Sequence, residues 1–439
     1  MGSKLGRFFC WMGLLVGLLP AFLSAQGGYQ EVYQVEQGRV RITQKMPVLF
    51  RTYPVYRGAN LYRVYLLVEV QNDFLQFILK EGRFEADMEL EAVITGRGNN
   101  FRESRIWRST AIARRYEDTN RRDLFHLTVD SVDLKPGKYQ ILLKYSDRNA
   151  RRRMNRKIRI ALLPLKGSFQ SPPLFLYPKT DSLNGNFPWV AHKPSALREY
   201  WDFNQDLWLF LVQGGSEAAA PVPVTVRVVQ ENEQTVLQTQ DTLQALAGQP
   251  RLQGVELPLA ASRLDEGLYQ LQVDYLNGQD TVQIRQALNI VWFTKPRSLW
   301  DFNTAFRATR YLMSEEEYKA FSRGGTDEKR ERFKAFWKQR DPTPETPFNE
   351  LMAEYYTRVD SANARFSQRR LPGWKTDPGR IFILYGPPDK VEDRSLDPID
   401  FPYLRWFYHL EGKELVFTFR AVEGRREYRL EDVEEKPLQ

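Results

Sequence analysis

Residues 373–388 read GWKTDPGRIFILYGPP, the densest set of turn-forming residues in this chain. In its first half, short polar side chains precede Pro378 and Gly379, where proline pre-sets φ and glycine takes the positive-φ position of a tight turn. The apolar run from Ile381 to Tyr385 has the length and composition of a strand, and a Gly-Pro-Pro sequence ends it. The pattern predicts a buried strand held between two rigid turns.

Helical patterns precede this stretch from about residue 296. Ser314 and Glu317 form a capping box that opens one helix, and Thr326 can open the next. Thr346 and Pro347 supply an N-cap and a first-turn proline for a third helix. Apolar residues recur along this third helix at three- and four-residue steps, which predicts one apolar stripe. The stripe comprises Phe348, Leu351, Met352, Tyr355, Val359, Ala362 and Phe366.

Strand patterns follow the stretch. The runs 403–410, 415–420 and 426–430 are joined by short polar connections, which predicts an antiparallel meander. Helices segregated against such a sheet make an α+β domain. We expect this domain to span residues 296–439.

Six charged residues are expected where the third helix meets the turn: Glu350, Glu354, Arg358, Asp377, Arg380 and Asp389. One interpretation is structural: Asp377 caps its own turn, Arg380 pairs with a carboxylate, and Trp374 fills the space between helix and sheet. The alternative is catalytic: Glu350 and Asp377 act as paired carboxylates on a glycoside while Trp374 stacks on a sugar ring. We favour the structural interpretation and predict no catalytic residue.

A family resemblance rests on the same stretch. Its motif residues are Gly373, Trp374, Thr376, Asp377, Gly379, Arg380, Gly386, Pro387, Pro388 and Asp389. This motif resembles the signature of the GWxTD-domain family of exported, largely uncharacterised bacterial proteins, and residues 336–366 resemble that family's helical lead-in. The resemblance covers about the last third of the chain. It implies no established substrate, cofactor or catalytic residue.

The preceding chain is expected to be all-β in two domains, residues 26–163 and 164–295. Strand-like runs are separated by clusters of Gly, Asn, Asp and Pro, and helical periodicity is weak. The runs are 62–69, 84–95, 124–129, 139–145 and 156–162 in the first domain, and 207–212, 224–229, 235–240, 267–273 and 282–293 in the second. This spacing favours two tandem immunoglobulin-like sandwiches, so the whole chain is expected to be multidomain.

A short internal sequence repeat links the two β domains. The segment 134–145 aligns with 264–275 at a constant offset of 130 residues, pairing Tyr139 with Tyr269. In each copy a glycine precedes the tyrosine by two positions and leads into a late strand. We expect each tyrosine to pack inward while its hydroxyl reaches back to loop backbone, as in a tyrosine corner.

The N-terminus has the layout of a secretory signal peptide over residues 1–25. Lys4 and Arg7 precede a short apolar run, and small residues stand before Gln26. The alternative, a membrane anchor, fits less well because the run is short and broken by glycine and proline. We therefore expect a secreted or periplasmic protein with an outer-membrane association left open. The single cysteine, Cys10, lies within this segment, so disulfides and thiolate sites are excluded from the mature chain.

The charge balance is mildly basic, with 63 Lys and Arg against 55 Asp and Glu. Basic residues are concentrated in the segment 148–159. Within it, Arg151, Arg153, Lys157 and Arg159 alternate with Arg152, Met154, Ile158 and Ile160, which suits one exposed face of a strand. The favoured interpretation of this cluster is a solvated strand face at the edge of a domain. The alternative is a binding site for anionic lipid headgroups or polysaccharide, whereas no nucleic-acid-binding motif accompanies the cluster. The candidate binding residues of the chain are Arg151, Arg153, Lys157, Glu350, Glu354 and Arg358.

Motifs for common enzyme chemistry are missing from the sequence. His126, His192 and His409 are isolated from one another, and neither a phosphate loop nor a nucleophile elbow occurs. We predict no cofactor and no metal. The favoured function is a non-enzymatic scaffold or a protein- or glycan-binding module of the bacterial envelope. The alternative is a carbohydrate- or cell-wall-active enzyme using Glu350 and Asp377.

Overall fold

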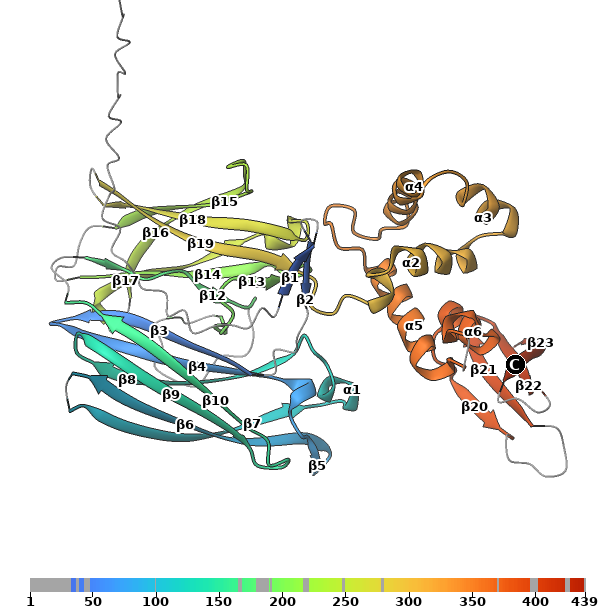
Figure 1. Cartoon of the computed structure of the whole chain (residues 1–439), viewed down its shortest axis with the longest axis horizontal. Coiled ribbons are helices and arrows are strands. Elements are labelled where there is room, and N and C mark those ends of the chain that lie inside the picture. Colours follow the sequence, from blue (N-terminus) through green and yellow to red (C-terminus); the bar gives the residue numbers. More distant parts are fainter. Residues whose placement is uncertain are drawn as a thin grey trace, which may run out of the picture. The chain divides into compact units, whose positions relative to one another are not determined.

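The computed structural model describes residues 33–36, 39–42, 48–98, 100–164, 168–178, 189, 192–215, 221–246, 249–277, 280–368, 371–394, 402–422 and 427–437 (Figure 1). The expected signal peptide, residues 1–25, lies outside them. The chain forms two compact units. The first comprises residues 1–199, 208–259 and 270–288, and the second comprises 200–207, 260–269 and 289–439. The molecule is mostly β, with several sheets and six α-helices among the described residues.

Two antiparallel sheets form the first β part of the first unit. One sheet has three strands in the order β3 (Val48–Gly58), β4 (Leu61–Gln71) and β8 (Phe125–Leu134). The other has the order β10 (Arg153–Leu162), β9 (Gly137–Asp147), β6 (Arg83–Arg97) and β5 (Ile78–Lys80), and β7 (Arg102–Ala113) also pairs with β6. The short elements are β1 (Tyr33–Glu36), β2 (Arg39–Ile42), η1 (Asn72–Phe74) and α1 (Tyr116–Thr119).

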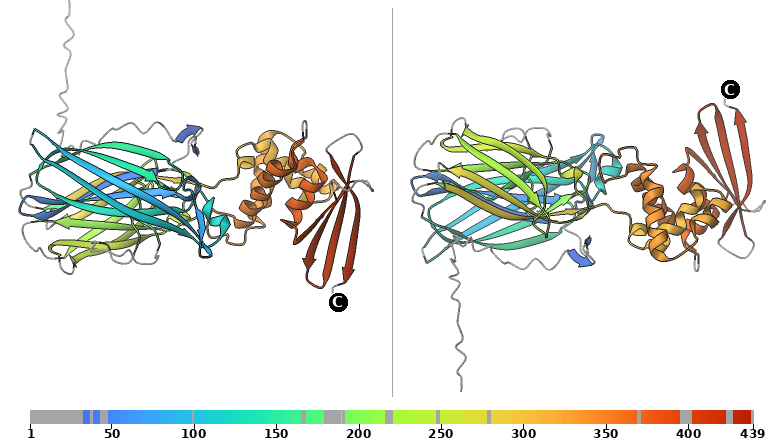
Figure 2. Two further views of the ribbon diagram at one scale, coloured as in Figure 1. Left: turned by 90° about the horizontal axis from the view of Figure 1, so that it is seen from below. Right: turned by 90° about the horizontal axis from the view of Figure 1, so that it is seen from above.

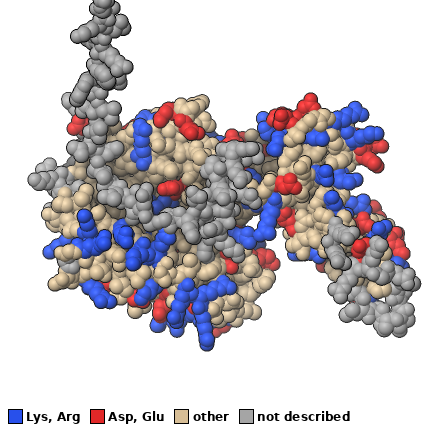
Figure 3. Space-filling view, viewed as in Figure 1, with Lys and Arg blue, Asp and Glu red and all other residues tan. Residues whose placement is uncertain are grey.

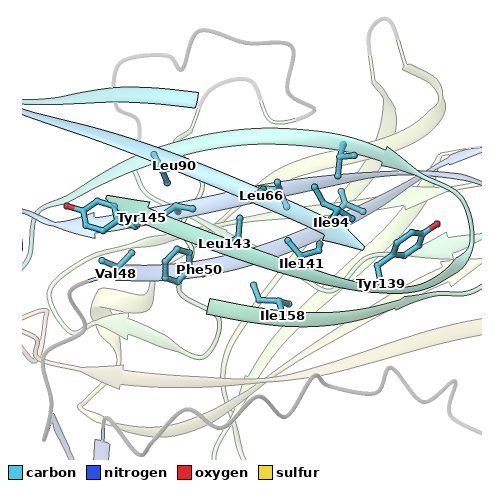
Figure 4. Packing of buried hydrophobic residues seen from close by; sticks show 14 of the residues in the cluster. Val48, Phe50, Leu66, Leu90, Ile94, Tyr139, Ile141, Leu143, Tyr145 and Ile158 are labelled. Atoms are coloured by element: carbon cyan, nitrogen blue, oxygen red, sulfur yellow. The ribbon is translucent and has the colours of Figure 1, made fainter. Parts of the chain in front are cut away.

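Both sheets contribute to one hydrophobic core. Leu66 on β4, Leu90 on β6 and Ile141 on β9 are all at most 1% exposed and belong to one cluster (Figure 4). Strands were predicted at β4, β6, β8, β9 and β10. The strands β3 and β7 were not predicted, because Pro54 interrupts the first and charged residues alternate along the second. An alternation of exposed and less exposed side chains with a period of two residues still indicates an edge strand, even where the segment has no continuous apolar run.

A nine-stranded sheet holds the second β part. Its order is β11 (Phe169–Gln170), β14 (Leu207–Gly214), β17 (Gln249–Leu259), β16 (Thr235–Leu246), β15 (Val222–Val229), β18 (Gly267–Asn277), β19 (Asp280–Val291) and β13 (Tyr200–Asp202). In addition, β12 (Leu174–Leu176) pairs with β14, and η2 (Ala261–Arg263) precedes β18. The pair β13 and β19 is parallel.

The internal sequence repeat of segments 134–145 and 264–275 is also seen in the structure. The strands β9 and β18 begin at the two equivalent glycines, Gly137 and Gly267. The Tyr139 hydroxyl donates to the Lys135 carbonyl at 2.9 Å, and the Tyr269 hydroxyl donates to the Asp265 carbonyl at 3.0 Å. The predicted tyrosine hydrogen bond is therefore confirmed in both copies.

Helices precede a four-stranded antiparallel sheet in the second unit. The helical elements are η3 (Arg297–Leu299), α2 (Phe302–Ala308), η4 (Thr309–Leu312), α3 (Glu315–Phe321), α4 (Thr326–Lys338), α5 (Glu350–Phe366), η5 (Gly373–Lys375) and α6 (Asp377–Tyr385). The sheet order is β20 (Lys390–Asp393), β21 (Tyr403–Leu410), β22 (Lys413–Ala421) and β23 (Tyr428–Pro437). Figure 2 shows the helices on one face of this sheet.

One core joins these helices to the sheet. Tyr356 and Val359 on α5, Phe382 on α6 and Phe419 on β22 are buried in the same cluster. The predicted capping box at Ser314 is confirmed, since Ser314 and Glu317 exchange side-chain to backbone hydrogen bonds. No helix in the described part of the chain is long and apolar enough to cross a membrane.

The predicted strand at residues 381–385 is wrong, because these residues form the helix α6. Thr376 is the N-cap, Pro378 lies in the first turn, and Gly386 ends the helix at φ 82°. A short buried apolar run carries no periodicity that separates strand from helix. Gly379 is not in the positive-φ region, so the predicted tight turn at that glycine is also wrong.

The predicted start of the third helix is also wrong. The helix α5 begins at Glu350, and its N-cap is Asn349 rather than Thr346. Asn349 Oδ1 accepts a hydrogen bond from the Met352 amide at 2.7 Å, and its Nδ2 donates to the Trp337 carbonyl at 2.8 Å. Asn349 thus caps one helix while holding the end of α4, a long-range contact that outweighs the local Thr-Pro signal.

Candidate functional site

The motif loop is held against the last turn of α5. Asn363 Oδ1 accepts from the Trp374 amide at 3.1 Å, and Ser367 Oγ accepts from the Gly373 amide at 2.8 Å. The Tyr311 hydroxyl donates to the Trp374 carbonyl at 2.8 Å. The backbone of the loop is therefore hydrogen-bonded to α5, to the C-cap residue of α5 and to η4.

At two positions of the motif, only glycine fits beside the neighbouring backbone. A Cβ atom on Gly373 would lie 2.0 Å from the Ala362 carbonyl oxygen, and one on Gly379 would lie 1.9 Å from the Gly373 carbonyl oxygen. These neighbours are backbone atoms that cannot move aside as a flexible side chain could. The motif thus brings the start of α6, the loop and α5 into direct backbone contact.

Thr376 connects the loop to α6. Its Oγ1 accepts from the Gly379 amide at 3.0 Å and donates to the Gly373 carbonyl at 2.8 Å. The residue is only 3% exposed, so both hydrogen-bonding capacities of the hydroxyl are used inside the fold. Thr376, not Asp377, is the cap that was expected at this turn.

Asp377 fixes the same helix end to the sheet. Its Oδ2 accepts a hydrogen bond from the Leu430 amide on β23 at 3.0 Å. A carboxylate in the first turn also interacts favourably with the positive end of the helix dipole. Sequence reasoning did not assign this role, because the partner lies 53 residues away in the chain.

The C-terminal end of α6 is held by Arg358 and Tyr408. Arg358 Nη1 lies 3.4 and 3.3 Å from the carbonyl oxygens of Ile383 and Leu384, where a cation satisfies the free carbonyl groups of a helix end. Arg358 also forms the predicted ion pair with Glu354. The Tyr408 hydroxyl donates to the Gly386 carbonyl at 3.0 Å.

Asp389 follows the Pro-Pro pair and bonds to β21. Its Oδ2 accepts from the His409 amide at 2.7 Å and lies 3.2 Å from His409 Nδ1. These hydrogen bonds lower the pKa of Asp389 below its usual value. On its other side, His409 Nε2 lies 3.2 Å from Glu414.

The two carboxylates of the catalytic alternative are not brought together. Glu350 lies at the first turn of α5, exposed, and accepts a hydrogen bond from the Thr343 hydroxyl at 2.7 Å. Asp377 follows the loop bound at Asn363, 13 residues further along α5, which corresponds to roughly 20 Å of helix. Paired carboxylates of glycosidases are about 5 to 9.5 Å apart.

Trp374 and Arg380 are likewise placed for packing. Trp374 is 4% exposed and contacts the Tyr311 ring edge-on, so its faces are not open to a sugar. The expected pairing of Arg380 with a carboxylate is not formed within the described ranges, and its Nε is buried without a hydrogen-bond partner. Nearby, burial raises the pKa of Tyr311, against the lowering effect of Arg310 and Arg380.

The basic cluster lies elsewhere, at the edge of the five-stranded sheet. Arg151 precedes the strand β10, and Arg153 and Lys157 are exposed along it, while Ile158 is buried. Exposed and less exposed residues alternate as predicted. Among the strands that the structure describes, β10 pairs with β9 alone, so it is an edge strand of its sheet.

The three histidines occupy separate places. His126 Nε2 lies 2.7 Å from the Ser109 hydroxyl. His192 stacks on Trp208 and lies 2.6 Å from a Glu256 oxygen. Together with His409 on β21, they form no shared cluster within the described residues.

A polar group missed by the sequence reasoning lies buried in the first unit. Glu69 on β4 is 0% exposed, and its Oε2 accepts from the Ser195 hydroxyl at 3.1 Å and the Ala196 amide at 2.9 Å. Burial raises the pKa of Glu69 and lowers that of nearby Lys193. The signal for this group was a single glutamate within the apolar run of β4.

Comparisons with known proteins place the motif in a described domain. Residues 267–436 match the family model of the GWxTD domain. No protein with a curated description matches the chain.

Similar solved structures are distant. A glycosyl hydrolase family 2 member from Bacteroides cellulosilyticus is 14% identical with a TM-score of 0.21, over 52% of this chain and 27% of that one. The β-glucuronidase of Bifidobacterium dentium is 10% identical with a TM-score of 0.21, over 52% and 39%. The α-2-macroglobulin of Escherichia coli is 9% identical with a TM-score of 0.18, over 58% and 18%. The chain thus spans well under half of each of these proteins, and likenesses of this size carry no argument about activity.

Proposed function

Since this chain carries a GWxTD domain over residues 267–436, we propose that it is an exported, non-enzymatic binding protein of the bacterial envelope. In this proposal the two β parts are tandem immunoglobulin-like sandwiches, and they present the α+β domain of residues 296–439, which carries the GWxTD motif, to a protein or glycan partner. Export rests on the signal-peptide pattern of residues 1–25. The mature protein would begin near Gln26 and reside in the periplasm or outside the cell, and its association with the outer membrane stays open.

One observation carries the proposal: apart from Arg380, whose Nε has no hydrogen-bond partner among the described residues, the polar residues of the motif hold the fold together. Thr376 caps α6, Asp377 binds the Leu430 amide, and the two glycines permit backbone contact. Catalytic groups generally need a free functional atom within reach of a substrate. The internal hydrogen bonds of Thr376, Asp377 and Asp389 support a structural role for these motif residues, and so a binding rather than a catalytic protein.

The test is a pull-down with the mature chain, residues 26–439, from its native envelope fraction. A parallel sample carries Glu350→Gln and Asp377→Asn together, which removes both candidate catalytic carboxylates while keeping side chains of similar shape. The proposal predicts that both proteins retain the same partner or glycan and that the retained material stays intact. Cleavage of that material by the wild type but not by the double variant would contradict the proposal.

A further inference from the structure

The outer face of the five-stranded sheet divides into two halves of different charge character. In antiparallel sheets, residues directly opposite each other point to the same face. Cross-strand pairing therefore arranges the outward residues of β10, β9, β6 and β7 in rows. In one half, acidic residues of β6 are matched by cations: Glu91 pairs with Lys144 at 3.0 Å and Glu89 with Arg108 at 3.0 Å.

The other half contains three consecutive rows without an acidic residue. The first row is Ala161, Lys138 and Arg97; the second is Arg159, Gln140, Thr95 and Arg102; the third is Lys157, Leu142, Val93 and Ser104. We call these the cationic rows. Five of their eleven residues are Lys or Arg, and all five are exposed. Figure 3 shows Lys and Arg side chains gathered over the strands of this part of the molecule.

None of these five cations forms an ion pair or hydrogen bond with the described parts of the chain. Neighbouring strands lie about 5 Å apart, and outward residues recur about every 7 Å along a strand. Like charges at this spacing repel each other by roughly 0.6 kcal/mol per pair in water before screening by salt. Concentrating these cations on a surface that carries no acidic residue therefore has a cost, which an anionic ligand relieves.

We propose that the cationic rows bind an acidic polysaccharide, a linear glycan carrying repeated carboxylate or other anionic groups. This assignment rests on the proposed function, and it names the class of partner that one surface of the protein binds. The basic cluster predicted from sequence contributes Lys157 and Arg159 through the edge strand β10. The sheet register adds Lys138, Arg97 and Arg102 from three other strands, which local sequence could not bring together.

The composition of the cationic rows favours a glycan over a lipid surface. The polar side chains Gln140, Thr95 and Ser104 lie between the cations and can exchange hydrogen bonds with sugar hydroxyls. Membrane-surface binding relies on exposed large apolar side chains beside the cations. In these rows the larger apolar residues, Leu142 and Val93, are only partly exposed, and none is aromatic.

The test measures binding of a fluorescently labelled oligogalacturonate to the mature chain by anisotropy, with a maltooligosaccharide of equal length as the neutral probe. The test variant carries Lys138→Gln, Lys157→Gln and Arg159→Gln. The control variant carries Lys319→Gln, Lys334→Gln and Lys338→Gln, three exposed lysines on α3 and α4 that give the same change in net charge.

The wild type is expected to bind the acidic probe and not the neutral one. The test variant should bind about tenfold more weakly, because each exposed ion pair contributes a factor of a few, and the control variant within about twofold of the wild type. The assignment is overturned if the wild type does not bind the acidic probe or if both variants lose affinity for it equally. It is also overturned if the wild type binds phosphatidylglycerol vesicles in place of the acidic probe. Shortening of the probe would instead contradict the proposed non-enzymatic function.

Discussion

At the scale of single residues, the GWxTD motif is explained by backbone proximity. Gly373 and Gly379 stand where a Cβ atom would meet a carbonyl oxygen at 2.0 and 1.9 Å. Neither residue has a positive φ, so the requirement is for space and not for an unusual backbone conformation. Sequence alone indicated that glycine mattered here, but it suggested the wrong physical reason.

Replacing Gly379 with alanine tests this explanation. The added methyl group would collide with backbone, so we expect Gly379→Ala to destabilise the second unit by roughly 3 kcal/mol or more, as severe overpacking does. Gly325→Ala is the matched control, since nothing lies within 4 Å of its Cβ position and its φ is −78°. Chemical unfolding followed by tryptophan fluorescence compares the two. Equal unfolding midpoints for the two variants would show that the backbone around Gly379 can move to accommodate a methyl group, and would contradict this explanation.

Other residue-scale features were predictable when their cause was local. The Ser314 capping box and the Tyr139 hydrogen bond span three and four residues, and the sequence predicted both. The partners of Asp377 and Asn349 lie 53 and 12 residues away, and they depend on how helices and strands meet. Such contacts cannot be derived from the spacing of residues within one segment.

At the scale of elements, α6 shows which sequence signals should have prevailed. Thr376 before Pro378 is a helix-start pattern, and Gly386 before Pro387 is a helix-stop pattern. The apolar run between them suits a buried helix as well as a buried strand. The signals at the two ends therefore decide that this segment is a helix, in spite of its β-favouring composition.

The C-terminal end of α6 depends on Arg358. We expect Arg358→Ala to destabilise the second unit by about 1 to 2 kcal/mol, because it removes both a cation and hydrogen-bond donors from the carbonyl end of the helix. Glu354→Ala is the control. It breaks only the exposed ion pair with Arg358 and should cost about 0.5 kcal/mol or less. Urea unfolding measures both, and an equal cost for the two changes would contradict the capping role.

At the scale of the whole molecule, the division into β strands followed by helices and a sheet was readable from periodicity. The pairing of strands was not, since sheet order joins segments far apart in the chain. The buried group around Glu69 illustrates the difference. Its hydrogen-bond donors are residues 195 and 196, more than 120 positions away in the chain. These hydrogen bonds connect β4 to a later segment of the first unit.

A pH dependence follows for the first unit. Burial, with a smaller effect from the Lys193 charge, lowers the pKa of His126 to about 4 from 6.5. The unfolded chain therefore takes up this proton at a higher pH than the folded chain does. Stability should be fully present above about pH 6.5 and fall by up to roughly 3 kcal/mol as the pH drops to 4.

The control for this pH effect is His126→Gln, which keeps a polar group near the Ser109 hydroxyl and removes the titration. Unfolding free energies of both proteins are measured from pH 7 to pH 4, and the difference between them isolates His126 from the carboxylates that titrate in the same range. A constant difference across this range would contradict the prediction.

The central claim is that the GWxTD motif builds the fold of its domain, and Trp374→Ala in the full-length chain tests it most directly. Amide hydrogen exchange followed by mass spectrometry reports locally on residues 377–386. Loss of a buried tryptophan costs about 3 kcal/mol or more, so these amides should exchange roughly a hundredfold faster than in the wild type, with Trp374→Phe in between. Unchanged exchange rates in α6 would contradict the claim and return the motif to the list of functional candidates.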